Sequence, residues 1–200
     1  VAYTIGLEKY GNDIFGETYE VIAMNLFRRE AKKIEREYLV PQLLKQTRDN
    51  LGPVLITTFV DGVNPRTLTY EKSWMTTGLL TDVLYCCNIM YTTRTVHEDF
   101  YLRNIIACLD FPNKTCRCTM IDFDRVRSFR TPETDGLLNQ WISAALMQVL
   151  MELAYVMHNI PGSTACYDSK QLVLRMMDLV TFGKSVYIIK KGMVYPNWDH

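Results

Sequence analysis

The sequence predicts an α+β protein in which a small sheet-rich front part and a larger helical back part enclose a cleft. Short apolar runs bounded by turn residues dominate the first sixty positions, and long apolar stripes at helical spacing dominate the rest. Between them lies "DGVNP" (Asp61 to Pro65), a strong breaker of regular structure. We therefore place one unit at residues 1–60 and a second at residues 61–200.

The front part is expected to hold a short antiparallel sheet and one helix. Apolar residues near helical spacing predict a helix from Thr18, a plausible N-cap, to about Leu39, with Pro41 as its end. The predicted strands are residues 1–8, 41–46 and 53–60, and the turn at 47–52 joins the last two in a hairpin.

The back part is expected to be mainly helical. Its predicted helices are 71–91, 137–158 and 169–180. A hairpin of strands 105–109 and 116–123, joined by the turn 110–114, lies between the first two helices. The last twenty residues predict only a closing segment of strand or loop.

Composition and charge indicate an ordinary folded chain without a polyanionic partner. The 200 residues are 48% hydrophobic and 22% charged, with 22 basic and 22 acidic residues. Because the charges balance, no global field attracts nucleic acid or a membrane surface. No run of about 18 apolar residues is present, so we expect neither a membrane span nor a membrane partner.

The six cysteines favour a reducing compartment. "CRC" at residues 116–118 lacks the two-residue spacer of common zinc sites, so a plain strand is preferred there. A disulfide from Cys108 to Cys116 or Cys118 across the hairpin is the open alternative. We expect a cytoplasmic protein; the chain begins at Val1, which leaves room for an upstream targeting segment.

Two polar loops flank the predicted hairpin. "VHEDFYLRN" (Val96 to Asn104) precedes its first strand, and "MIDFD" (Met120 to Asp124) closes its second. A hairpin brings Asn104 and Asp122 together at its open end, with Asp99 in the same pocket. Amide and carboxylate oxygens suit Mg²⁺, and Asp99 would orient an attacking hydroxyl or accept its proton. Each residue alone fits an ordinary turn or strand end, whereas the ordered set favours a site.

His97-x-Asp99-x-x-x-x-Asn104 followed by Ile121-Asp122-Phe123 resembles the catalytic loop and metal-binding motif of the protein-kinase-like superfamily. The closer similarity is to the aminoglycoside-phosphotransferase and choline-kinase branch and to fungal kinase-like proteins, because Asp124 replaces the usual glycine. Tyr101 stands where protein serine/threonine kinases have lysine, and Arg103 is a candidate substitute. The resemblance implies a bilobal kinase-like fold with a reduced N-lobe and a mainly helical C-lobe.

The resemblance also implies a nucleotide site. Backbone groups at Phe59, Val60 and Asp61 would hold the adenine edge. Lys9 would bind the α- and β-phosphates and pair with a helix glutamate, for which Glu30 is the choice and Glu35 and Glu37 are the rivals. Asp135 is similar to the aspartate that anchors the catalytic loop in the family.

The expected function is an ATP- and Mg²⁺-dependent phosphotransferase that moves the γ-phosphate to a hydroxyl of a protein or small molecule. Asp99, Asn104 and Asp122 would be catalytic, and Asn104 and Asp122 would hold the metal. No G-x-G-x-x-G precedes Lys9. The alternative is therefore a pseudokinase, a nucleotide-binding or protein-interaction scaffold.

Overall fold

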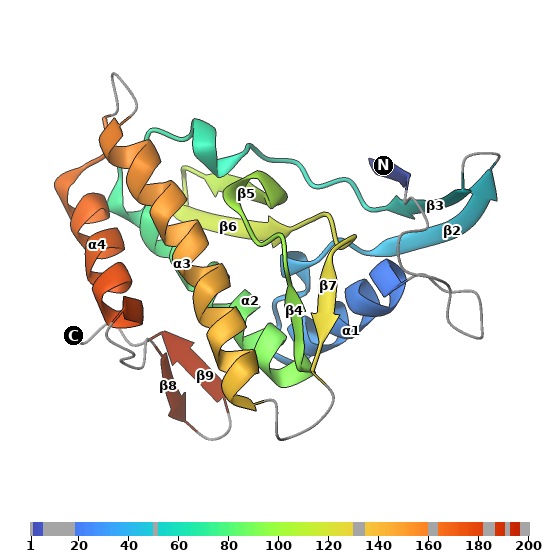
Figure 1. Cartoon of the computed structure of the whole chain (residues 1–200). Coiled ribbons are helices and arrows are strands. Elements are labelled where there is room, and N and C mark those ends of the chain that lie inside the picture. Colours follow the sequence, from blue (N-terminus) through green and yellow to red (C-terminus); the bar gives the residue numbers. More distant parts are fainter. Residues whose placement is uncertain are drawn as a thin grey trace.

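The structure, a computed structural model, describes residues 2–5, 19–49, 52–129, 135–159, 164–181, 187–190 and 193–196 (Figure 1). These residues form an α+β arrangement of four α-helices and small antiparallel sheets. The helices are α1 (Tyr19–Lys33), α2 (Ser73–Thr93), α3 (Asp135–Asn159) and α4 (Tyr167–Thr181). Short 3-10 helices cover Glu37–Leu39, Pro65–Thr67 and Leu102–Asn104.

Nine short strands in the described residues pair only in antiparallel fashion. They are β1 (Ala2–Ile5), β2 (Leu43–Asp49), β3 (Gly52–Thr57), β4 (Thr95–His97), β5 (Ile105–Asp110), β6 (Thr115–Met120), β7 (Val126–Ser128), β8 (Tyr187–Lys190) and β9 (Met193–Pro196). The first sheet has the order β1-β3-β2, and the others are the pairs β4-β7, β5-β6 and β8-β9. Both predicted hairpins are thus present. Near the chain end, where strand or loop was expected, β8 and β9 pair as strands.

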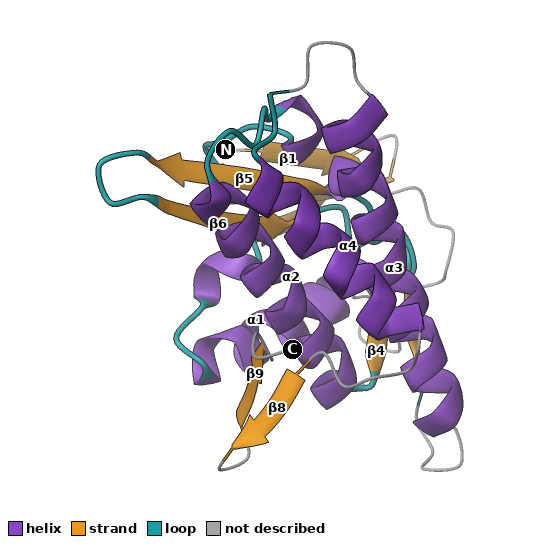
Figure 2. Ribbon diagram, turned by 90° about the vertical axis from the view of Figure 1, so that its left-hand side faces the viewer, coloured by secondary structure: helices purple, strands orange, loops and turns teal. Residues whose placement is uncertain are grey.

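Helix α2 is the centre of the molecule. It contacts α1, α3, α4 and β6, and Figure 2 shows it between the outer helices and the β5-β6 hairpin. Leu79, Leu80 and Val83 are fully buried, and each such side chain contributes about 1.5–3 kcal/mol relative to exposure. Gly78 lets α2 approach β6 closely, because a Cβ there would lie 2.4 Å from the Cys116 carbonyl oxygen.

Helix α1 is shorter than the sequence predicts, which corrects the expected end at Leu39 before Pro41. Glu35 adopts a left-handed φ of 57°. The Glu35 N–H donates to the Lys32 carbonyl at 3.1 Å, and the Arg36 N–H donates to the Ala31 carbonyl at 2.9 Å. This hydrogen-bond pattern is a Schellman motif, which closes a helix without glycine or proline.

Helix α3 is apolar along most of its length. By length and composition alone, residues 135–158 would suffice to cross a membrane. Core helices pass the same test, and α3 packs its fully buried Leu138, Val149 and Leu153 into the common core with α2 and α4. The packing accounts for the apolar residues on the buried face, whereas Leu137, Met151 and Tyr155 are exposed.

The six cysteines are all free, so the alternative disulfide from Cys108 to Cys116 or Cys118 is wrong. Cys108 lies opposite Arg117 in the β5-β6 register, and its thiol donates to the Asp61 carbonyl at 2.7 Å. The described residues contain no group of three His, Cys, Asp or Glu side chains placed to hold a metal ion.

Candidate functional site

Strand β7 and the residue before it hold the start of the loop between β4 and β5 through backbone hydrogen bonds. Pairing of β4 with β7 sets His97 opposite Val126, and the Glu98 N–H donates to the Arg125 carbonyl at 2.9 Å. The buried His97 ring contacts the Ile121 carbonyl through Nε2 at 3.1 Å, and because a carbonyl only accepts, Nε2 carries the proton. Burial lowers the pKa of His97. A neutral, buried ring suits a scaffold and not a proton shuttle.

Asp99 is buried and hydrogen-bonded through both carboxylate oxygens. Arg103 Nη2 donates to Oδ1 at 2.6 Å, and Asn104 Nδ2 donates to Oδ2 at 2.8 Å. Burial alone would raise the pKa of Asp99, but the hydrogen bonds from Arg103 and Asn104 outweigh it and lower the pKa. The carboxylate is therefore ionised at neutral pH and able to orient a hydroxyl.

Asn104 and Asp122 meet at the open end of the β5-β6 hairpin. Ile105 pairs with Met120, and the Ile121 N–H donates to the Asn104 carbonyl at 2.9 Å, so Asp122 is the next residue along. Asn104 Nδ2 also donates to the Asp99 carbonyl at 2.8 Å. Because Nδ2 is committed to Asp99, the amide oxygen of Asn104 is left as an acceptor.

Asp122 turns the chain out of strand β6. Its φ is 62°, a left-handed conformation that aspartate and asparagine tolerate better than most residues. The side chain is exposed, whereas the following Phe123 is buried against Phe27 of α1, with ring centroids 5.6 Å apart and planes at 86°. Such an edge-to-face pair adds about 0.5–1.5 kcal/mol beyond burial. Phe123 thus links α1 to the residue that carries the exposed carboxylate.

A cavity of about 380 Å³ lies beside Asp122. It is lined by α1, by the end of β3 and the segment after it, by β5 and by the residues that follow β6. Its lining residues include Glu20, Met24, Phe59, Val60, Asp122 and Phe123. The size lies in the range typical of small-molecule and cofactor sites. Of the predicted adenine-edge residues, Phe59 and Val60 line the cavity, whereas Asp61 does not, and its carbonyl accepts from Cys108.

Glu20, in the first turn of α1, is the acidic residue that the sequence analysis missed. Its side chain is only 8% exposed. Burial, followed by the negative charges of Asp122 and Asp124, raises its pKa to about 7. Burial and Asp122 also raise the pKa of Asp124. Glu20 shares a helix face with Met24 and Phe27, at spacings of four and three residues, and that spacing was the available signal.

Glu30, the predicted glutamate, lies outside this cavity. Lys33 Nζ donates to its two carboxylate oxygens at 2.8 and 2.7 Å, and Arg29 donates at 3.3 Å. The hydrogen bond from Lys33 lowers the pKa of Glu30 despite burial. The rival Glu35 is exposed. Lys9 lies outside the described residues, and the described cavity lining contains no lysine or arginine.

Two residues outside the predicted set hold the loop after Asp99. Glu152 of α3 accepts the Leu102 N–H at 2.8 Å and forms an ion pair with Arg66. Asn64 Nδ2 donates to the Leu102 and Arg103 carbonyls, each at 3.2 Å. The predicted anchor, Asp135, pairs instead with Arg94 at 2.5 Å, before β4. In the described residues, Glu152 contacts the loop after Asp99 directly through the Leu102 N–H.

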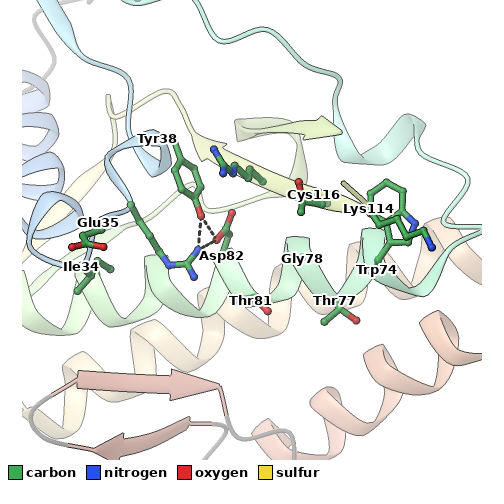
Figure 3. A pocket seen from close by; sticks show the side chains of 13 residues that line it. Ile34, Glu35, Tyr38, Trp74, Thr77, Gly78, Thr81, Asp82, Lys114 and Cys116 are labelled. Atoms are coloured by element: carbon green, nitrogen blue, oxygen red, sulfur yellow. Dashed lines mark hydrogen bonds and ion pairs between the residues drawn. The ribbon is translucent and has the colours of Figure 1, made fainter. Parts of the chain in front are cut away.

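A larger cavity, of about 550 Å³, lies elsewhere, between the segment after α1, helix α2 and the β5-β6 turn (Figure 3). Asp82, 2% exposed, accepts from Arg36 at 2.8 Å, from the Tyr38 hydroxyl at 2.9 Å and from the Cys118 N–H at 2.9 Å. Burial outweighs these contacts and raises the pKa of Asp82 to about 6. The network joins the segment after α1 to α2 and β6, and Figure 3 shows the contacts of Asp82 with Arg36 and Tyr38.

The raised pKa of Glu20 gives a pH prediction. The folded protein keeps the Glu20 proton up to about pH 7, whereas the unfolded chain loses it near pH 4.5. The free energy of unfolding therefore falls as the pH rises from about 4.5 to about 7. Glu20→Gln should therefore stabilise the protein by about 2–3 kcal/mol above pH 7 and have little effect below pH 4.5. Urea unfolding from pH 4 to 8, without nucleotide or divalent cations, measures the difference.

Glu30→Gln is the matched control with the opposite sign. Because the Glu30 pKa is lowered, its charge stabilises the fold at neutral pH, and that contribution is lost as pH falls through the lowered pKa. If the free energies of unfolding of the wild type and Glu20→Gln differ by the same amount at every pH, the pKa of Glu20 is not raised in the folded protein.

The fold and site together define an α+β protein with acidic and amide oxygen donors at one hairpin end beside a small-molecule cavity. Among solved structures, the Rio2 kinase–ADP/Mg²⁺–phosphoaspartate complex from Chaetomium thermophilum is similar, with 16% sequence identity and a TM-score of 0.49. The similarity covers 90% of this chain and 55% of that chain, so this chain spans about half of its length. No protein-family model and no curated protein sequence matches.

Proposed function

We propose that the protein is a phosphotransferase of the kinase-like class that binds a nucleotide with Mg²⁺ and transfers its γ-phosphate to a hydroxyl. The observation that carries the proposal is the convergence of Asp99, Asn104 and Asp122 at one end of the β5-β6 hairpin. Asp122 is one of the residues that line the 380 Å³ cavity, and in this proposal the phosphates of a bound nucleotide lie beside its carboxylate.

The donor set fits a magnesium ion. The free amide oxygen of Asn104 and the exposed carboxylate of Asp122 are two hard oxygen ligands, and Mg²⁺ commonly takes one or two such ligands plus waters and phosphate oxygens. The negative charges of Asp122 and Asp124 contribute to raising the pKa of Glu20, and a cation beside Asp122 would offset this repulsion. When bound, the metal would supply charge neutralisation at the transferring phosphate.

The chain's own residues then position the reactants. Asp99, kept ionised by Arg103 and Asn104, accepts the hydrogen bond of the acceptor hydroxyl and orients its oxygen. His97 and Phe123 hold the two loops in register from the buried side. Catalysis of this class is mainly positioning and charge neutralisation, which matches a rigid, hydrogen-bonded loop.

Glu20 is the proposed partner for a phosphate-binding lysine, in place of Glu30, because it lines the cavity and Glu30 does not. Lys9 keeps that lysine role in the proposal. In the proposal the adenine edge lies against Phe59 and Val60, which line the cavity. These residues are at the junction of a proposed N-lobe of residues 1–60 and a C-lobe of residues 61–200. Asp124 continues to favour the aminoglycoside-phosphotransferase, choline-kinase and fungal kinase-like branch.

The Asp122→Asn variant tests the metal assignment. Asparagine tolerates the left-handed φ of 62°, so the backbone is retained while the charge is lost. Wild-type protein should gain thermal stability with ATP and gain more when Mg²⁺ is added, because a ligand that binds only the folded state stabilises it. The variant should lose the metal-dependent part. A wild type without any Mg²⁺-dependent shift contradicts the enzyme assignment.

A pseudokinase is the second candidate, and two observations favour it. Both oxygens of Asp99 accept hydrogen bonds from the chain itself, and the described cavity lining has no cation for the phosphates. A pseudokinase would bind nucleotide and release no phosphate from it. Measuring nucleotide binding and phosphate release on one preparation separates the two functions.

A further inference from the structure

Two further cavities lie along α3. One, of about 350 Å³, is lined by Arg66, Met151, Glu152, Tyr155 and Val156. The other, of about 190 Å³, lies between residues 96–101 and the first half of α3, including Trp141 and Gln148. The second includes Phe100 and Tyr101 in its lining, and Glu152 links the first to Leu102. Their α3 residues recur every three or four positions and so share one face of the helix. We call Trp141, Gln148, Met151 and Tyr155 the α3 stripe.

The α3 stripe is mostly apolar, with Gln148 as its polar member, and it is exposed at Met151 and Tyr155. Met151 is 53% exposed and Tyr155 is 61% exposed, although the opposite face of the same helix is buried in the core. Large exposed apolar side chains beside a cavity are typical of a surface that binds a ligand. The stripe is tied to the catalytic loop, because Glu152, between Met151 and Tyr155 in sequence, accepts the Leu102 N–H.

Among the described lining residues, the acidic and basic side chains each have a partner: Arg66 pairs with Glu152, and Glu98 pairs with Arg127. The neighbouring Arg103 pairs with Asp99. The Arg127 guanidinium also lies 4.4 Å above the Trp141 ring. The three pairs sum to zero charge, so the described residues around these cavities offer no unpaired acidic or basic side chain to a charged ligand.

We propose that the α3 stripe binds the body of the acceptor, and that this acceptor is an uncharged hydroxyl compound with an apolar or aromatic body. The proposal rests on the proposed phosphotransferase function and names the substrate class of the same site. A charged acceptor would lose hydration at this surface without gaining an ionic partner, which costs free energy. A cationic alcohol or a polyamine sugar is therefore disfavoured.

The transfer balances with the groups named. The acceptor oxygen forms a bond to the γ-phosphorus. At the same time the bond between the γ-phosphorus and the β,γ-bridging oxygen breaks, and the electron pair of that bond stays on the oxygen of the departing nucleoside diphosphate. The hydroxyl proton passes to Asp99 and then to water.

A matched set of three phenols tests the class. 4-Ethylphenol is neutral, tyramine is its cationic analogue and 4-hydroxyphenylacetate is an anionic one at pH 7. Titration followed by protein NMR shifts should give a dissociation constant for 4-ethylphenol that is at least about tenfold lower than for either charged probe, with shifts at Met151 and Tyr155. Tighter binding of either charged probe by the wild type overturns the proposal.

Two variants locate the binding. Tyr155→Ser should weaken 4-ethylphenol binding several-fold, whereas Tyr91→Ser, which removes an exposed tyrosine from α2, should not. Arg66→Gln leaves Glu152 without its ionic partner, so the preference should move from 4-ethylphenol toward tyramine. If Tyr91→Ser and Tyr155→Ser act equally, or if Arg66→Gln leaves the preference unchanged, the stripe is not the site.

The phenol titrations and the variant comparisons do not depend on nucleotide binding or phosphate transfer. They require no ATP, so they decide the ligand class even if the Mg²⁺-dependent shift of the wild type is absent. In that case the phosphotransferase function fails and the neutral-ligand surface stands. Selective 4-ethylphenol binding together with ³¹P NMR detection of its phosphate ester supports both.

Discussion

Replacing Asp99 by asparagine is expected to slow phosphate release from ATP by about 10²–10⁴-fold, the range over which a positioned acid–base group contributes. The Asp99 carboxylate accepts hydrogen bonds from both Arg103 and Asn104, which fix its position in the loop. Its pKa is held low, so the charge is present at neutral pH and the variant removes it. Nucleotide affinity should change by less than about threefold, because Asp99 does not line the 380 Å³ cavity.

The measurement uses water as acceptor when no other hydroxyl is supplied. Phosphate release is followed against ATP concentration for the wild type, Asp99→Asn and Asp110→Asn. Asp110 lies at the far end of the hairpin, where it binds only Asn113, and its variant should match the wild type. Full activity in Asp99→Asn would remove Asp99 from the mechanism.

Replacing Asp82 by alanine should cost about 2–4 kcal/mol of stability at pH 7. The change leaves the Arg36 guanidinium, the Tyr38 hydroxyl and the Cys118 N–H without their shared acceptor. Arg36 is still partly exposed, which places the cost below that of a fully buried broken pair. The Arg36 guanidinium also keeps its cation–π contact with the Tyr85 ring, at 4.0 Å, in the variant, which further limits the cost.

Urea denaturation monitored by circular dichroism gives the free energy of unfolding for this comparison. Asp178→Ala removes an exposed carboxylate from α4 and should stay within about 0.5 kcal/mol of the wild type. If both variants lose the same small amount, the network around Asp82 does not hold the end of α1 to β6.

The sequence predicted the β5-β6 hairpin, because a hairpin is a local structure whose register follows from its turn. That register brings the backbone of Asn104 to Ile121, the residue before Asp122. It also predicted α2, α3 and α4 to within a few residues, since each carries a long apolar stripe. The end of α1 was missed because a left-handed Glu35 closes the helix without a glycine or proline signal.

The remaining parts of the site depend on contacts distant in sequence. Strands β4 and β7 have three residues each and lie about 30 residues apart, too short to show alternation and too far apart to suggest pairing. Glu20 reaches the acidic loop only through the packing of Phe27 on Phe123, and Glu152 reaches Leu102 from a helix fifty residues later. Such partners are set by tertiary packing, which periodicity does not encode.

The central claim is that the nucleotide and its metal bind in the cavity between Glu20 and Asp122 and not in the larger cavity at Asp82. Substituting Mn²⁺ for Mg²⁺ tests it, because the paramagnetic ion broadens NMR signals of nearby amides. With ATP present, substoichiometric Mn²⁺ should broaden the amide signals of Asn104 and Asp122 and then Glu20, sparing Asp82, and Asp122→Asn should abolish the effect. Broadening centred on Asp82, or broadening that is unchanged in Asp122→Asn, would contradict the claim.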